Sequence, residues 1–340
     1  MHIRALPDED MRRAAWVNLD RFATAWVTAL PCNDAFVSNA EFQEIATFYY
    51  GMPSPACMAA VGQRIAGTRY TVDPHGTRLT SAALPGDGWR THHDAIKWRI
   101  HEDAKHMQAR CRTEVFGLFA ACIPQGRREQ AQAQVARKRQ GLVPDFLITA
   151  PVDGPERSLL YEVKCLHFGS STYRADTQRC EAVARRARAL PAEYGKKARE
   201  VDNRFCETLP DHVGPVQLKL RTFEPVRGLV FGAWGETSPD TEKLLTVLAH
   251  IGATRHWRGM RCKDATSAVG ALAWMLRRRW ALTALRENAR LKLERLEFVG
   301  RGAEAAVTRR VASRTAHEAR ARSTAMHLLR GPRVGMRRGF

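Results

Sequence analysis

The stretch 143–166, VPDFLITAPVDGPERSLLYEVKCL, decides the fold class that the sequence predicts. Two runs rich in apolar residues flank the segment VDGPE, in which Asp153 and Gly154 favour a tight turn. We therefore expect an antiparallel hairpin. Three polar residues, Asp145, Glu162 and Lys164, interrupt the apolar runs and require an explanation.

A pairing that places Asp145 opposite Glu162 accounts for all three polar residues. Side chains alternate along a strand, so Glu162 and Lys164 share one face, and Asp145 joins them from the neighbouring strand. In the same register apolar residues meet on the other face: Phe146 faces Tyr161, and Ile148 faces Leu159. The strands are thus a scaffold, and the three polar residues are the candidate site.

This trio of side chains suits metal-assisted hydrolysis of a phosphodiester. Two carboxylates whose Cβ atoms lie roughly 5 Å apart repel each other unless a cation lies between them. Mg²⁺ or Mn²⁺ takes such oxygen ligands and completes its shell with water and phosphate oxygens. We predict metal contacts from Asp145, Glu162 and Val163, with Lys164 activating water or stabilising phosphate charge and Glu114 as a further catalytic acid. The alternative is an exposed edge hairpin whose acids and lysine face water.

The charge of the chain points to a polyanionic partner. Its 340 residues include 54 Lys and Arg against 35 Asp and Glu, a formal net charge of +19. Such an excess attracts polyanions, and arginine contacts phosphate in bidentate fashion. We expect DNA, or alternatively RNA, as the partner. A basic solvated surface is the other explanation.

Cysteine usage and hydropathy restrict the class of protein. The eight cysteines are scattered without a CxxC pair, which argues against a disulfide framework and an intact zinc ribbon. No run of about 18 apolar residues occurs, and the first residues lack the apolar stretch of a signal peptide. We expect a soluble intracellular protein without a membrane partner, nuclear if its target is chromosomal DNA.

Periodicity and composition divide the chain into five expected segments. They are a helical N-terminal segment at 1–52, an irregular module at 53–88, an α/β core at 89–255, a C-terminal helical extension at 256–300, and a basic tail at 301–340. The tail is either disordered or a nucleic-acid-binding arm.

Capping residues and helix-breaking residues set the expected ends of the individual helices and strands. Helices are expected after Ser38 or Asn39, over 89–109 with Thr91 as the N-cap, from Ser238 to Gly252, and over 265–298. Strands are expected over 111–119 and 227–236. The basic helical region after residue 180 is expected to be interrupted at Pro191.

The basic helical region is a candidate nucleic-acid surface. Its basic face carries Arg179, Arg185, Arg186, Arg188, Lys196, Lys197 and Arg199 with Tyr194 among them, and the candidate contacts are Arg179, Arg185, Arg186, Tyr194, Lys196 and Lys197. Such residues would hold a phosphate backbone without reading sequence. The alternative is a solvated helix face.

The residues Pro144-Asp145 and Glu162-Val163-Lys164 resemble the motif of the PD-(D/E)XK restriction-like endonuclease superfamily. The runs GDGWRTHHDAIKWRI, RTEVFGLF, VPDFLI, LLYEVKCL and LVFGAWGE look like the C-terminal endonuclease region of non-LTR retrotransposon polyproteins. The resemblance covers about residues 50–255. It implies an α/β, restriction-endonuclease-like core in the order αβββαβ, a mixed sheet flanked by helices, with helical extensions at both ends.

The resemblance also assigns roles around the motif. His93 takes the place of a histidine at the start of a helix and is a candidate phosphate contact. The superfamily often draws an acid from that helix, where Glu102 is available as an alternative to Glu114. The knuckle that precedes the helix in these proteins is degenerate here, because Cys57, His75, His92 and His93 lack close cysteine pairs. Mg²⁺ or Mn²⁺, and no zinc, is the expected cofactor.

Three functions follow as hypotheses. The first is a retrotransposon-derived, metal-dependent endonuclease that hydrolyses DNA phosphodiester bonds. The second is a catalytically inactive nuclease fold that binds nucleic acid through its charge. The third is a structural protein whose basic tail docks on an acidic partner or RNA.

Overall fold

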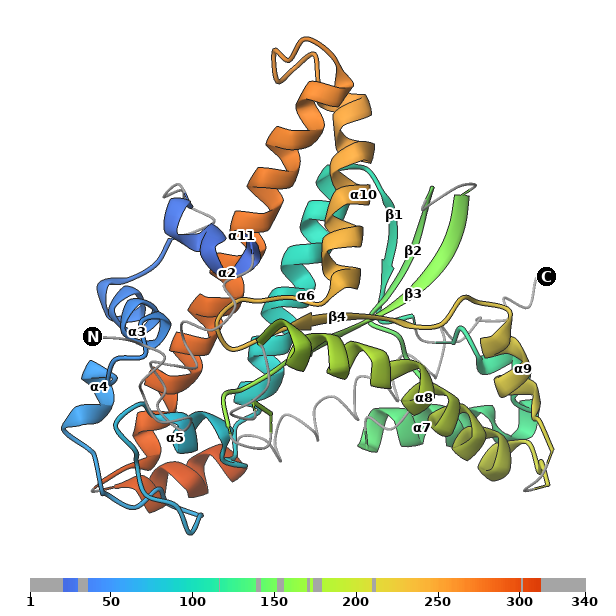
Figure 1. The fold of residues 1–340 in the computed structure, drawn as a ribbon. Helices are drawn as coiled ribbons and strands as arrows, with labels where there is room; N and C mark the ends of the chain where they lie inside the picture. Colours follow the sequence, from blue (N-terminus) through green and yellow to red (C-terminus); the bar gives the residue numbers. More distant parts are fainter. Residues whose placement is uncertain are drawn as a thin grey trace, which may run out of the picture.

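The computed structural model describes residues 21–29, 36–115, 117–138, 142–151, 156–169, 172–173, 179–209, 212–300 and 302–312. They form a mixed α/β fold in which helices flank one mixed sheet (Figure 1). The predicted α/β class is therefore confirmed at this level.

A four-stranded sheet lies at the centre of the fold. Its strands, in the spatial order β1-β2-β3-β4, are β1 (Arg110–Thr113), β2 (Phe146–Pro151), β3 (Glu156–Cys165) and β4 (Arg227–Phe231). The first three strands pair antiparallel, and β4 pairs parallel to β3. The predicted register is confirmed, since Phe146 pairs with Tyr161 and Ile148 with Leu159. The predicted turn at 152–155 lies outside the described residues.

Helices precede the sheet and are inserted between its strands. Before β1 come α2 (Arg21–Ala25), η2 (Trp26–Thr28), α3 (Asn39–Tyr49), α4 (Pro55–Met58), α5 (Thr77–Ser81) and α6 (Gly88–His106). Between strands lie η4 (Ala120–Cys122), α7 (Gln125–Lys138), α8 (Arg179–Phe205) and α9 (Pro215–Arg221). After β4 come α10 (Pro239–His256), α11 (Ala265–Arg295) and η5 (Leu296–Phe298), and residues 303–312 are also helical.

The two faces of the sheet pack against different helices. On one face Leu159, Tyr161 and Val163 of β3 join a large core with residues of α6, α10 and α11. On the other face Leu160 packs with residues of α8 and α9, including Tyr194. Figure 1 shows α10 and α11 side by side along α6, with α8 on the other side of the strands. The alternation of β3 therefore directs Glu162 and Lys164 toward α8.

The extensions pack on the core. Helices α2 and α3 both contact α11, and Phe22 stacks on the buried Trp280. Ser38 is the N-cap of α3, and its hydroxyl and Glu41 form a reciprocal capping box. The prediction of a cap at this point is thus confirmed at Ser38. None of the described helices is both long enough and apolar enough to span a membrane.

Two limits near β1 differ from the prediction. The strand expected over 111–119 ends at Thr113, because Glu114 and then Gly117 have positive φ angles of 43° and 83°, which break the extended conformation. The helix expected over 89–109 with Thr91 as the N-cap begins at Gly88, with Asp87 as the N-cap, and ends at His106. The Thr91 hydroxyl donates to the Asp87 carbonyl as a residue within the first turns.

Two limits around β4 also differ. The strand expected over 227–236 ends at Phe231, because Gly232 and Gly235 form a turn closed by the hydrogen bond from the Gly232 amide to the Glu236 carbonyl. Ser238 occupies the N-cap position of α10 as predicted, although its hydroxyl donates to the Gly228 carbonyl and makes no capping bond, and α10 continues past Gly252 to His256. Gly252 is a packing residue, since a Cβ there would lie 2.1 Å from the Met107 sulfur.

The prediction that the basic helical region breaks at Pro191 is wrong. Pro191 lies inside α8, which runs through 27 residues without interruption. Leu190 and Tyr194, on either side of it, are buried and hold both halves against the sheet. The tail at 301–340 was expected to be either disordered or a nucleic-acid-binding arm, and residues 303–312 of it form a helix with Ala303 and Ala306 buried. Residues 313–340 lie outside the described part of the chain.

Candidate active site

The motif residues lie where β2 begins beside the middle of β3. The Val163 amide donates a hydrogen bond to Asp145 Oδ2, with a nitrogen-to-oxygen distance of 2.8 Å. Asp145 directly precedes β2, and the register of the pair continues to place it opposite Glu162. The structure therefore brings Asp145, Glu162 and Lys164 together, as the alternation of the sequence indicates.

His93 links the Asp145 carboxylate to helix α6. Its Nε2 lies 3.2 Å from Asp145 Oδ2, and its Nδ1 lies 3.0 Å from Asp94 Oδ1. Burial alone would lower the pKa of His93, but hydrogen bonds to Asp145 and Asp94 outweigh it and raise the pKa to about 9. Burial raises the pKa of Asp145, yet the bonds from His93 and the Val163 amide leave it below its usual range. At neutral pH the pair is an imidazolium facing a carboxylate.

Glu162 is buried, and both of its carboxylate oxygens have partners. Lys164 Nζ donates to one oxygen, and the Tyr194 hydroxyl donates to the other. Burial and the neighbouring Glu162 carboxylate raise the pKa of Tyr194, which remains protonated and acts as a donor. Tyr194 thus fixes the orientation of Glu162 from α8.

Glu114 adds a further acid at the edge of this cluster. Its amide donates to the Asp145 carbonyl at 2.9 Å, and its carboxylate accepts from Lys97 Nζ at 2.6 Å. Lys97 also contacts Asp94 at 2.9 Å and is only 2 % exposed. Burial alone would lower the pKa of Lys97, but the two carboxylates raise it. Glu102, the alternative acid, is 58 % exposed and pairs with Arg99 instead.

Asp94 and Lys97 are site residues that the sequence reasoning missed. They lie three residues apart on α6 and follow His93, so they project from the end of the helix that reaches Asp145. Their signal in the sequence is the run of polar residues at i, i+1 and i+4 from His93, next to the buried Ile96 and Ile100.

The oxygen atoms that lie where β2 begins beside β3 suit a hard divalent cation. Asp145 and Glu162 offer carboxylate oxygens, which Mg²⁺ and Mn²⁺ prefer. Continuing the register places Val163 opposite Pro144, which has no N–H to donate to the Val163 carbonyl. That carbonyl shares the strand edge at which the Val163 amide reaches Asp145. The part of the chain that the structure describes contains no group of three or more His, Cys, Asp and Glu that could hold a metal.

No protein-family model, no curated protein and no solved structure matches this chain. The chemistry of its own residues is therefore the basis for proposing a function.

The candidate nucleic-acid contacts on α8 differ in how exposed they are. Tyr194 does not lie on the basic surface where it was predicted, because its side chain is 2 % exposed and faces Glu162. Arg186 is paired with Glu193 through its two terminal guanidinium nitrogens, Nη1 and Nη2, so part of its charge is neutralised. Arg185, Lys196 and Lys197 are exposed, and the Lys197 ammonium lies 5.3 Å from the centre of the Tyr194 ring. The Arg179 side chain lies outside the described residues.

The four residues of the degenerate knuckle lie in different surroundings. Cys57 is buried in a small core beneath α5, whereas His75 Nδ1 lies 3.1 Å from the Met52 carbonyl. His92 packs against His167, and His93 faces Asp145. The described residues thus place these four side chains in separate environments.

Proposed function

We propose that this chain is a metal-dependent endonuclease of the PD-(D/E)XK type that hydrolyses DNA phosphodiester bonds. The observation that carries the proposal is the hydrogen bond from the Val163 amide to Asp145, which ties the acid of the PD pair to the middle of the ExK triplet. The element order α6, β1, β2, β3, α8, β4 supports the restriction-endonuclease-like core. Helices α7 and α9 are insertions in that order.

Each side chain of the cluster has a role in this proposal. Asp145, Glu162 and the Val163 carbonyl hold the metal, and Tyr194 keeps Glu162 in position. Lys164 shares the face of Glu162, where its ammonium can orient the attacking water or stabilise charge on the phosphate. A bound Mg²⁺ or Mn²⁺ would supply Lewis-acid stabilisation of the charge that develops on the phosphodiester.

Lys97 and His93 balance the charge of the surrounding acids. Lys97 lies between Asp94 and Glu114, while His93 lies between Asp94 and Asp145. In the proposed enzyme His93 is also the group through which α6 approaches a phosphate. The resemblance to retrotransposon endonuclease regions leads us to propose a retrotransposon origin for the chain.

A second function has its own support. Each carboxylate of the cluster is engaged by a protein donor, which is also what a nuclease fold without catalysis would contain. Such a protein would bind DNA or RNA through its net charge of +19. It would bind equally well with and without EDTA.

Plasmid nicking tests the proposed activity. Wild-type protein is incubated with supercoiled DNA in Mg²⁺, in Mn²⁺ and in EDTA, beside Asp145→Asn and Lys164→Ala. We expect nicking in either metal, none in EDTA, and a fall in rate of about 100-fold or more in each variant. Lys263→Ala, which removes an exposed lysine from the loop between α10 and α11, is the matched control and should keep the full rate.

Equal behaviour of the wild type and both variants in metal would reject the catalytic proposal. If the same samples bind DNA with a steep salt dependence, the inactive nuclease fold is the correct function. Loss of all binding on removing residues 313–340 would instead favour a docking protein that acts through its tail.

A further inference from the structure

A hollow lies between α8 and α9, on the side of α8 that faces away from the Glu162 contact. Its volume is about 390 Å³. The polar side chains and the glycine that line it are Lys196, Arg199 and Gly195 of α8, with Gln217 and Arg221 of α9. Neither helix contributes an acidic side chain to its lining.

The cations of this hollow are not neutralised by the rest of the described chain. Lys196, Arg199 and Arg221 make no ion pair with another described residue. Other arginines nearby do have acidic partners, such as Arg186 with Glu193 and Arg227 with Glu224. Three like charges around one hollow repel one another, and a bound anion would relieve that repulsion.

Gly195 leaves the backbone of α8 uncovered where it lines the hollow. Gly195 lies inside α8, where glycine is less favourable than alanine, yet a Cβ at this position would meet no atom within 4 Å. Packing therefore does not require glycine here. The missing side chain instead lets a ligand approach the helix backbone closely.

Helix α9 is fixed in position beside α8. The buried Asp202 of α8 accepts hydrogen bonds from the Val216 and Gln217 amides at 2.8 and 2.9 Å, which caps the start of α9. The buried Asp202 carboxylate thus joins the two walls of the hollow. The cations that line the hollow therefore need little rearrangement to contact an anion.

We propose that this hollow binds a phosphodiester group of a polynucleotide backbone. Arg199 and Arg221 face the phosphate from opposite walls, and Lys196 adds a third cation. Tyr194 and Arg199 are five residues apart on α8, or about 7.5 Å along its axis, but they lie on different faces, so a strand bound in the hollow would pass around α8 to reach the cluster around Glu162. The identification of the anion as a polynucleotide rests on the proposed function, whereas the anion site itself does not.

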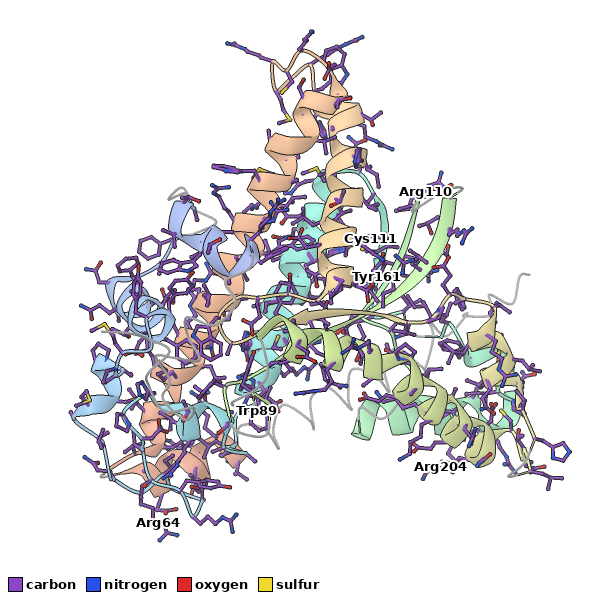
Figure 2. The ribbon with its side chains drawn as sticks, in the orientation of Figure 1. Arg64, Trp89, Arg110, Cys111, Tyr161 and Arg204 are labelled. Carbon is purple, nitrogen blue, oxygen red and sulfur yellow. The ribbon has the colours of Figure 1, made fainter. Side chains whose placement is uncertain are left out.

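Binding measured in EDTA tests the inference without any contribution from catalysis. A labelled DNA duplex is titrated with the full chain by fluorescence anisotropy between about 50 and 200 mM salt. The test variant is the double substitution Arg199→Gln/Arg221→Gln. The matched control is Arg64→Gln/Arg69→Gln, which removes the same charge from exposed arginines. Figure 2 places Arg64 at the opposite end of the molecule from Arg204, on the last turn of α8.

We expect the test variant to lose about tenfold in affinity and to lower the slope of log K against log salt by about one, because both arginines contact the same phosphate. The control should stay within about threefold of wild type, the effect of net charge alone. Circular dichroism checks that all proteins are folded. Equal losses in the test and control variants would overturn the proposal.

A second experiment distinguishes binding of a polynucleotide from binding of a small anion. Pyrophosphate binding is measured by calorimetry on the wild type and on the test variant. If the double substitution abolishes pyrophosphate binding and leaves the DNA affinity unchanged, the hollow is a small-anion site and the polynucleotide proposal is wrong. Both experiments are made in EDTA on proteins that keep Asp145 and Glu162, so absence of nicking would not affect either result.

Discussion

The main-chain amide of Val163 and the side-chain carboxylate of Asp145 are joined by a 2.8 Å hydrogen bond across the β2–β3 boundary. An amide in this position would donate to the neighbouring strand in a regular ladder. Pro144 is the residue opposite Val163. The next residue, Asp145, accepts the bond from the Val163 amide with its side chain, in place of a main-chain carbonyl. A main-chain donor therefore fixes the position of the Asp145 carboxylate, and no flexible side chain is needed to hold it.

Asp145→Asn separates the charge of this residue from its shape. Asparagine keeps an acceptor for the Val163 amide but removes the anion beside His93. We expect the pKa of His93 to fall from about 9 toward its ordinary value, because the charge that stabilises the imidazolium is lost. Titration of the histidine signals by NMR in metal-free protein measures this shift. An unchanged His93 pKa would show that Asp94 alone raises it.

Tyr194→Phe removes the hydroxyl that donates to Glu162 and keeps the buried ring. The buried Glu162 carboxylate then lacks one donor, which should lower the free energy of unfolding by about 1–3 kcal/mol. Urea denaturation measures this loss. Tyr70→Phe is the matched control, because the Tyr70 side chain is 40 % exposed, and it should change stability by less than about 0.5 kcal/mol. Equal stability of the two variants would contradict the role of Tyr194.

Gly228→Ala tests the contact between β4 and α8. A Cβ at Gly228 would lie 2.8 Å from the Ala187 Cα and 2.7 Å from a Leu190 methyl group, so the helix must move away from the strand. We expect a loss of about 1–3 kcal/mol in the free energy of unfolding. Gly270→Ala, in α11, meets no atom within 4 Å and should stabilise the protein by up to about 1 kcal/mol. Opposite signs in the two denaturation curves are the expected result.

The burial of His92 should make the protein sensitive to acid. Burial, with the nearby His167, lowers the pKa of His92 to about 3 in the folded chain, below the ordinary value of about 6.5 in the unfolded chain. The unfolded chain therefore binds more protons between these values. The stabilisation is complete above about pH 6.5 and is lost as the pH falls toward 3, with about 2 kcal/mol lost between pH 7 and pH 5.

Denaturation of the wild type and of His92→Gln at pH 7 and pH 5 measures this contribution. The variant should lose less stability than the wild type over that interval, whatever its stability at pH 7. His250→Gln, which replaces an exposed histidine of α10, should retain the wild-type pH dependence. A His92→Gln curve parallel to that of the wild type would place the acid sensitivity elsewhere.

Local patterns in the sequence were sufficient to predict the hairpin. Its register follows from matching apolar residues on one face, and a slip of one residue would have buried Asp145 and Glu162 against the large core. The caps of α3 and α10 also follow from short signals, Ser38 with Glu41 and Ser238 with Pro239. In each of these cases the residues that determine the structure are neighbours in the chain.

The parts that the sequence did not predict depend on contacts between distant residues. Helix α8 continues through Pro191 because the buried residues on both sides of it pack on the sheet, and tertiary packing outweighs the local preference. His93 reaches Asp145 across 52 positions of the chain, so the roles of Asp94 and Lys97 become apparent only once α6 is placed beside β2. Likewise, the positive φ angle of Glu114 has no marker in its residue type.

Pro191 has a consequence for where α8 opens locally. Proline has no N–H, so the Ala187 carbonyl four residues earlier lacks its usual helical donor, and the helix is most easily bent at this turn. Before this point Val183 and Ala187 pack with Val230 of β4, and after it Tyr194 and Ala198 belong to the core shared with α9. Pro191 thus marks the turn at which α8 passes from its contact with β4 to the core shared with α9, and local opening of the helix is expected to begin there.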